Sequence, residues 1–131
     1  MPLVLIVDDN DQNRKLARDV LGAAGFRTMD AANATEGIGL AVAHVPDVIL
    51  MDLRLPDMHG ADARQALGQD ERTARIPVVA ISALRLEDSG DWLEEAGFAG
   101  WIEKPILVGP FPEQVRRYCR GTGDPPARMP C

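Results

Sequence analysis

The residues of this chain that could do chemistry stand where apolar runs end. Asp8 and Asp9 directly follow the apolar run 3–7, and Asp52 directly follows the run 48–51. Continuous apolar runs of this length are typical of strands that are buried on both faces, as in a parallel sheet. Three carboxylates at strand ends could hold a hard divalent cation such as Mg²⁺, and one of them could act as a nucleophile. Taken alone, Asp52 could equally be a cap of the next helix.

A hydroxyl group and an ammonium group follow two later apolar runs. Ser82 comes after residues 78–81, and Lys104 comes shortly after residues 98–102. Both groups can donate hydrogen bonds to phosphoryl oxygens, and a metal on one side with an ammonium on the other stabilises phosphoryl transfer. Each residue also has a simpler interpretation, because the acidic pair could be only a helix cap, Ser82 a turn residue and Lys104 a surface lysine.

The elements that would position these residues alternate between strands and helices. Strands are predicted over 3–7, 26–31, 48–52, 78–81 and 98–102, and helices over 11–24, from 33 or 35 to about 44, over 60–68, within 86–96 and from 111 onward. This alternation indicates an α/β fold with a parallel sheet covered by helices on both faces. The element count fits a flavodoxin-like, doubly wound five-stranded sheet of order 2-1-3-4-5 with five helices. Asp8, Asp9 and Asp52 should then converge, because the first and third strands are neighbours.

Length and composition indicate one globular domain. The chain has 131 residues, of which 46% are hydrophobic and 26% are charged, as in ordinary soluble domains. We expect this domain over residues 1–120, followed by a tail over 121–131 that is rich in proline and glycine and should be unstructured. The formal net charge of -6 offers no basic surface for nucleic acid, so no nucleic-acid partner is expected.

The cysteines and the hydropathy predict a cytoplasmic protein. Cys119 and Cys131 are the two cysteines, and they form neither a disulfide framework nor a metal-ligand spacing, which favours a reducing compartment. No apolar run reaches the roughly 18 residues of a membrane-spanning helix. No basic segment precedes the first apolar run, so a signal peptide is not expected either.

Taken together, the motifs resemble the receiver domain of two-component response regulators, the CheY-like family. They are the acidic pair Asp8-Asp9, the segment MDLRLPDMHG around Asp52, Ser82-Ala83, and Lys104-Pro105 in WIEKPI. Each motif is weak alone, but the set in this order is specific, and the resemblance covers residues 3–120. The ending KPILVGPF…RRY is similar to single-domain regulators of the DivK type.

The resemblance implies a stand-alone phosphoacceptor in phosphorelay signalling rather than an enzyme. Asp52 would accept a phosphoryl group from the phosphohistidine of a histidine kinase or histidine phosphotransfer protein. Mg²⁺ would be held by Asp9, Asp52 and the backbone carbonyl of Arg54, with Asp8 acting through water. The signal would pass through contacts with a downstream protein target, without nucleic acid or membrane as partners.

The resemblance also implies a switch, at which this chain departs from the family pattern. Ser82 and Lys104 would contact the phosphoryl oxygens, and the peptide bond between Lys104 and Pro105 would be cis. In receivers, a Tyr or Phe three residues before the lysine turns inward as the Ser or Thr moves toward the phosphoryl group. Trp101 stands there in this chain, and its larger ring needs more room to turn inward.

Two other classes of function remain open at this point. Aspartyl-phosphate hydrolases also use parallel sheets with acids at the strand ends, but they typically carry the nucleophile in a DxD arrangement after the first strand, where this chain has DDND. A receiver-like interaction module that is not phosphorylated is the second alternative. The acids and Lys104 argue against it, whereas Trp101 leaves it open.

Overall fold

The computed structural model describes residues 2–82, 97–103 and 109–118. In chain order these residues form β1 (Leu3–Val7), α1 (Asp11–Ala23), β2 (Arg27–Ala31), α2 (Ala34–His44), β3 (Val48–Asp52), α3 (Gly60–Gly68), β4 (Val78–Ser82), β5 (Gly100–Glu103) and α5 (Phe111–Tyr118). The helix predicted within 86–96, Lys104 with Pro105, and the tail over 121–131 lie outside the described residues.

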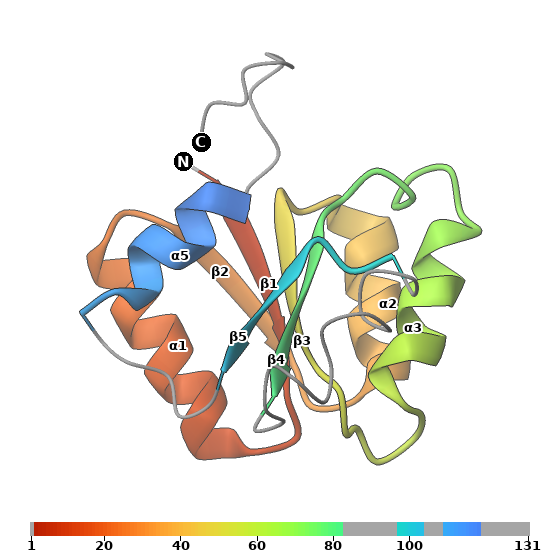
Figure 1. Cartoon of the computed structure of the whole chain (residues 1–131), viewed down its shortest axis with the longest axis horizontal. Coiled ribbons are helices and arrows are strands. Elements are labelled where there is room, and N and C mark those ends of the chain that lie inside the picture. Colours follow the sequence, from red (N-terminus) through yellow and green to blue (C-terminus); the bar gives the residue numbers. More distant parts are fainter. Residues whose placement is uncertain (1, 83–96, 104–108, 119–131) are drawn as a thin grey trace.

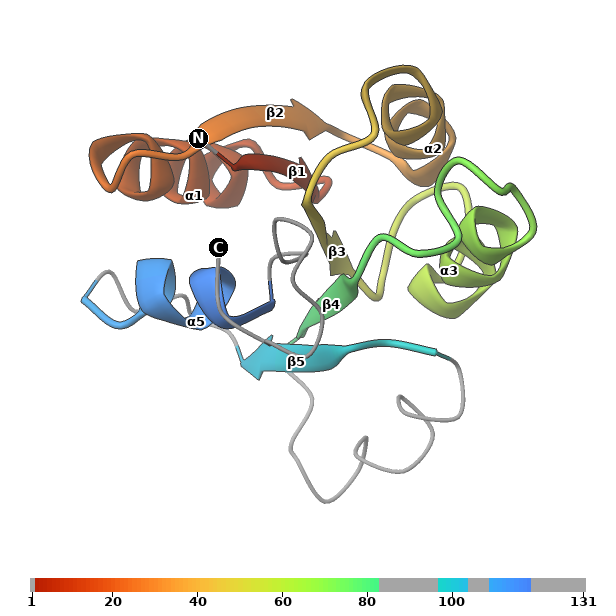
Figure 2. The same ribbon diagram turned by 90° about the horizontal axis from the view of Figure 1, so that it is seen from above.

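The five strands form one parallel sheet of order β2-β1-β3-β4-β5. In Figures 1 and 2, α1 and α5 cover one face of this sheet, and α2 and α3 cover the other. The predicted fold class, strand order and two-sided helix packing are therefore confirmed, and β2 is an edge strand as expected. Among the helices of the described ranges, none is both long enough and apolar enough to cross a bilayer.

The two faces of the sheet carry two separate hydrophobic clusters. Leu5 and Val7 of β1 belong to the cluster under α2 and α3, and Val4 and Ile6 belong to the cluster under α1 and α5. All four are at most 2% exposed. Successive side chains of a strand alternate between faces, so a central strand with helices on both sides must be apolar throughout. This is why β1 is apolar throughout and β3 has its one polar residue, Asp52, at the last position.

The first two helices begin at asparagine caps. The side chain of Asn10 accepts a hydrogen bond from the N–H of Asn13, and that of Asn33 accepts one from Glu36. Such a side chain satisfies one of the N–H groups that the first turn of a helix leaves without a partner. Helix α1 ends at Ala23, one residue earlier than predicted, and Gly25 at φ +97° provides the left-handed turn into β2.

The prediction for the fifth strand was shifted. We expected the strand over 98–102, whereas β5 spans Gly100–Glu103. Phe98 is 6% exposed and packs in the cluster under α2 and α3, although it precedes the strand. Gly97, at φ +95°, makes the turn before it. A buried aromatic residue has the same sequence pattern whether it belongs to a strand or to the loop before it, so periodicity alone misplaced the boundary.

Helix α5 begins at Phe111, as predicted from the prolines around it. Pro112 falls in its first turn, where the missing N–H has no helical partner to lose. Phe111 and Val115 are fully buried against the sheet. Arg116 lies over the ring of Phe26 at 5.0 Å, a cation–π contact that joins α5 to the residue just before β2.

Candidate functional site

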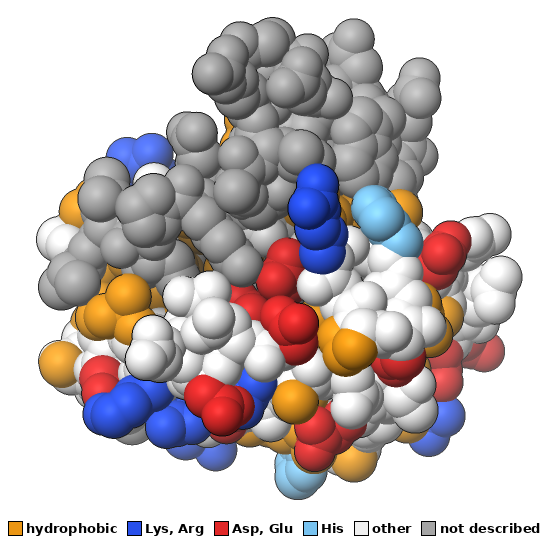
Figure 3. Space-filling view, turned by 90° about the horizontal axis from the view of Figure 1, so that it is seen from below, with side chains coloured by type: hydrophobic (Ala, Val, Ile, Leu, Met, Phe, Trp, Pro, Cys, Tyr) orange, Lys and Arg blue, Asp and Glu red, His pale blue; other side chains and the backbone are white. Residues whose placement is uncertain are grey.

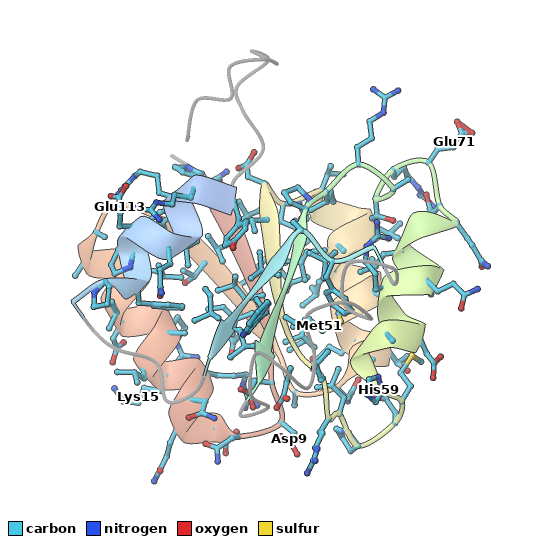
Figure 4. All side chains as sticks on the ribbon, in the orientation of Figure 1. Asp9, Lys15, Met51, His59, Glu71 and Glu113 are labelled. Carbon is cyan, nitrogen blue, oxygen red and sulfur yellow. The ribbon has the colours of Figure 1, made fainter. Side chains whose placement is uncertain are left out.

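Three carboxylates meet where β1 and β3 end side by side. Asp8 follows β1, Asp52 ends β3, and the two strands pair in parallel up to Val7 and Met51. Asp8, Asp9 and Asp52 each place one carboxylate oxygen within 4.8 Å of the other two. Asp8 is 4% exposed and Asp52 is 8% exposed, whereas Asp9 is exposed. Figure 3 looks onto this face and shows acidic side chains gathered near its centre, and Figure 4 shows Asp9 at the lower edge of the sheet.

The spacing of these oxygens fits a magnesium ion. An octahedral Mg²⁺ with oxygens at about 2.1 Å keeps its ligand atoms about 3 to 4 Å apart. The three oxygens, all within 4.8 Å of one another, need only small side-chain movements to reach that geometry. Carboxylates this close repel one another, and a divalent cation between them removes the repulsion. The chemistry of the donor set, three carboxylates with no nitrogen or sulfur, is that of a hard cation.

The turn between β1 and α1 holds Asp8 in place. The carboxylate of Asp8 accepts hydrogen bonds from the backbone N–H of Asn10 at 2.9 Å and from the amide of Asn13 at 3.4 Å. Its backbone carbonyl accepts one from Nη1 of Arg14 at 2.6 Å, while Nε of Arg14 binds Asp30 of β2 at 2.9 Å. The Arg14 side chain is only 14% exposed. The sequence alone shows Arg14 only as a polar residue of the first helix. Its spacing does not reveal that its partners are the backbone carbonyl of Asp8 and the carboxylate of Asp30 on β2.

The loop after β3 keeps Arg54 beside Asp52. The N–H of Arg54 donates to Oδ1 of Asp52 at 3.0 Å, and Arg54 pairs with His59 in an isolated antiparallel bridge. Nδ1 of His59 accepts a hydrogen bond from the N–H of Ala61 at 3.0 Å, so this histidine caps α3. The backbone of Arg54, whose carbonyl was predicted as a metal ligand, thus lies next to the central carboxylate of the site.

Gly60 brings the start of α3 into contact with the backbone of Asp52. Its N–H donates to the carbonyl of Leu53 at 2.9 Å. A Cβ atom at this position would lie 2.9 Å from the backbone oxygen of Asp52 and 2.9 Å from Cα of Leu53. Because both neighbours are backbone atoms of a buried strand end, neither can turn away as a flexible side chain would. Gly60 therefore sets how closely the start of α3 packs against the backbone of Asp52 and Leu53.

Replacing Gly60 with alanine is expected to destabilise the protein by about 2 kcal/mol, as overpacking in a dense core does. The displaced strand end should also weaken Mg²⁺ binding, which calorimetric titration would measure beside thermal unfolding. Gly39→Ala is the matched control, because Gly39 is an exposed helix residue of α2 with nothing within 4 Å of an added Cβ. That control should stabilise the protein by up to about 1 kcal/mol. Equal unfolding midpoints for Gly60→Ala and the parent would contradict the close approach.

The other predicted site residues belong to strands β4 and β5 or directly follow β5 in the sequence. Ser82 is the last residue of β4 and pairs in register with Glu103, the last residue of β5. Both strand ends therefore lie at the same edge of the sheet as Asp52. Trp101 of β5 is half-buried and packs against the cluster under α2 and α3. Lys104 follows β5 directly and lies outside the described residues.

Comparison with known proteins gives the same family for most of the chain. A family model described as the response regulator receiver domain matches residues 4–115. The polar-differentiation response regulator DivK of Brucella anthropi is 37% identical over 115 residues, which cover 88% of this chain and 94% of that protein. DivK of Brucella ovis is also 37% identical over the same coverage.

Solved structures show the same fold. The chemotaxis protein CheY4 of Vibrio cholerae superposes with a TM-score of 0.85 at 24% identity, covering 90% of this chain and 98% of that one. The receiver domain of the sensor histidine kinase PA1611 from Pseudomonas aeruginosa, solved with a magnesium ion coordinated in its active site cleft, gives a TM-score of 0.81 at 26% identity. It covers 89% of this chain and 96% of that one. With a matching family model, a relative of 37% identity and this fold, the chain belongs to the response regulator receiver domain family.

Proposed function

We propose that this chain is a phosphoacceptor in two-component phosphorelay signalling, with Asp52 as the residue that takes the phosphoryl group. The observation that carries this proposal is the cluster of Asp8, Asp9 and Asp52 at the strand ends of a receiver fold. Of the three, Asp52 ends the central strand β3, between β1 and β4. The receiver unit spans residues 1–120, and the tail over 121–131 is a separate segment.

In the transfer step, one carboxylate oxygen of Asp52 attacks the phosphorus of a phosphohistidine. The phosphorus–nitrogen bond breaks, the imidazole leaves and takes up a proton, and an acyl phosphate forms on Asp52. Asp9, Asp52 and the backbone carbonyl of Arg54 would hold Mg²⁺, with Asp8 acting through water, and the ion would supply positive charge to the phosphoryl oxygens. Ser82 and Lys104 would donate hydrogen bonds to those oxygens.

The related proteins support the metal and the partners. The receiver domain of PA1611 carries Mg²⁺ in its active site cleft, and its chain is that of a sensor histidine kinase. We expect a histidine kinase or a histidine phosphotransfer protein as the phosphodonor, and a downstream protein target, with both contacts made in the cytoplasm. The chain assists its own phosphorylation and dephosphorylation and is not an enzyme acting on a separate substrate. The match over 94% of the DivK relative favours an output through contacts of the receiver itself.

Ser82 and Trp101 form the proposed switch. Ser82 ends β4, and Trp101 lies on the adjacent strand β5, paired in register with Ala80. Movement of the serine toward the phosphoryl group would open room for the indole, which is half-buried against the hydrophobic cluster. The large ring means that this chain needs a wider inward pocket than a receiver with Tyr or Phe.

Incubation with acetyl phosphate and Mg²⁺, followed by measurement of the intact mass, tests the proposal. We expect one phosphoryl adduct per chain with Mg²⁺ present and none after the divalent ions are removed with EDTA, because the clustered acids repel an anionic donor without a cation. An adduct that hydroxylamine removes would identify an acyl phosphate. Absence of any adduct with Mg²⁺ or Mn²⁺ would instead favour the non-phosphorylated interaction module.

A further inference from the structure

Asp57, an acidic residue of the loop after β3, ties this loop to the start of helix α2. The carboxylate of Asp57 accepts hydrogen bonds from the backbone N–H of Ala34 at 2.9 Å, from the N–H of Thr35 at 2.8 Å and from the Thr35 hydroxyl at 2.6 Å. The hydroxyl bond, followed by the two backbone bonds, lowers the pKa of Asp57 to about 2. The carboxylate is therefore ionised at neutral pH, and all three bonds are charge-assisted.

Helix α2 already has a cap of its own. The side chain of Asn33 accepts from the N–H of Glu36 at 2.8 Å, and Oε1 of Glu36 accepts from the N–H of Ala32 at 3.0 Å. This pair differs from a capping box only in that Glu36 accepts from Ala32, one residue before the N-cap Asn33, and it begins the helix from within its own sequence. Asp57 adds bonds from a position 22 residues beyond Thr35. Unlike the Asn33 cap, Asp57 connects α2 to the loop after β3.

The loop that Asp57 holds is the one that carries Arg54. At its base, the N–H of Gly60 binds the carbonyl of Leu53, and Arg54 pairs with His59. At its far end, Asp57 lies on the first turn of α2. The loop is thus held at its base and at its far end, and Arg54, whose N–H lies 3.0 Å from Oδ1 of Asp52, is part of the attachment at the base.

We propose that Asp57 and Thr35 are positioning residues for the metal site, because their contact holds the loop in the place where the Arg54 carbonyl can bind Mg²⁺. This inference rests on the proposed function, in which that carbonyl is a ligand. Neither residue touches the ion or the phosphoryl group. They act by placing the Arg54 carbonyl before Mg²⁺ binds. Loss of the contact should therefore weaken Mg²⁺ binding more than it lowers the stability of the fold.

Thr35→Val is the sharpest variant, because it removes the hydroxyl donor while keeping both the size and the net charge. We expect the dissociation constant for Mg²⁺, measured by calorimetric titration with the metal alone, to rise about fivefold. This is less than the roughly tenfold or greater loss usual for partners that contact a ligand directly. Thr35→Ser restores a hydroxyl and should bind Mg²⁺ as the parent does.

Asn33→Ala is the matched control for helix stability. It removes a cap of the same helix and should lower the unfolding midpoint by a few degrees, but it leaves the contact between Asp57 and Thr35 in place and should keep the parent affinity for Mg²⁺. If Asn33→Ala weakens Mg²⁺ binding as much as Thr35→Val does, or if Thr35→Val leaves the affinity unchanged, Asp57 is only a second helix cap. A parent chain that binds no Mg²⁺ would overturn the proposed function itself, and the inference with it.

Discussion

Asp52→Asn is expected to abolish the phosphoryl adduct completely. The carboxamide has no anionic oxygen and cannot attack phosphorus at neutral pH. Asparagine keeps the shape of the side chain and an acceptor oxygen for the N–H of Arg54, which lies 3.0 Å from Oδ1 of Asp52. The loss should therefore be chemical and should leave the fold intact. The measurement is the intact mass after incubation with acetyl phosphate and Mg²⁺, compared with the parent under the same conditions.

Asp62→Asn is the matched control for this experiment. Asp62 is an exposed acid in the first turn of α3, so the substitution makes the same change of charge away from the cluster, and the adduct should form as in the parent. Each variant is assayed at a Mg²⁺ concentration that saturates it, because Asp52 is also a proposed ligand. A full adduct on Asp52→Asn would place the acceptor on another residue.

Asp9→Asn should weaken Mg²⁺ binding about a hundredfold, and Asp8→Asn only about tenfold. Asp9 is the exposed member of the cluster and is the proposed direct ligand. Asp8 is 4% exposed, and its carboxylate already accepts hydrogen bonds from Asn10 and Asn13. Since a direct carboxylate ligand bonds to the ion itself, its removal should weaken Mg²⁺ binding more than the removal of a carboxylate that acts through water.

The Mg²⁺-dependent gain in stability gives an independent measurement of the same difference. At a concentration of 100 times the parent dissociation constant, Mg²⁺ should stabilise the parent by about 2.7 kcal/mol, and a variant that binds a hundredfold more weakly by about 0.4 kcal/mol. Without metal, neither Asp8→Asn nor Asp9→Asn should lower stability greatly, because each relieves repulsion among the three acids. Equal losses of Mg²⁺ affinity for the two variants, or a larger loss for Asp8→Asn, would show that the two roles are reversed.

The architecture was predictable because the central strands leave little ambiguity. Val48–Asp52 is buried on both faces, so its apolar run could not be an amphipathic helix or a half-exposed strand. The boundaries of β1, β3 and α3 agree with the prediction to the residue. The start of β5 was predicted two residues too early, because Phe98 is apolar and buried although it precedes the strand. Its burial depends on how α3 and the sheet pack around it, which the sequence pattern does not show.

The convergence of the three acids also followed from the sequence. Their positions at strand ends, combined with the strand order that βα alternation favours, were enough to bring Asp8, Asp9 and Asp52 to one edge. The roles proposed for Ser82 and Lys104 were likewise predicted from position, and they stay predictions.

The contacts that hold the site residues in place are visible only in the tertiary structure. Arg14 reaches the carbonyl of Asp8, and Asp57 reaches Thr35 across 22 residues of chain. In the sequence, Gly60 is only the first residue of the helix predicted over 60–68, yet its missing Cβ is what lets α3 approach Asp52. Hydrophobic periodicity records which face of an element is buried. It does not record which polar group a side chain meets on another element, because that depends on distances that exist only once the elements have packed.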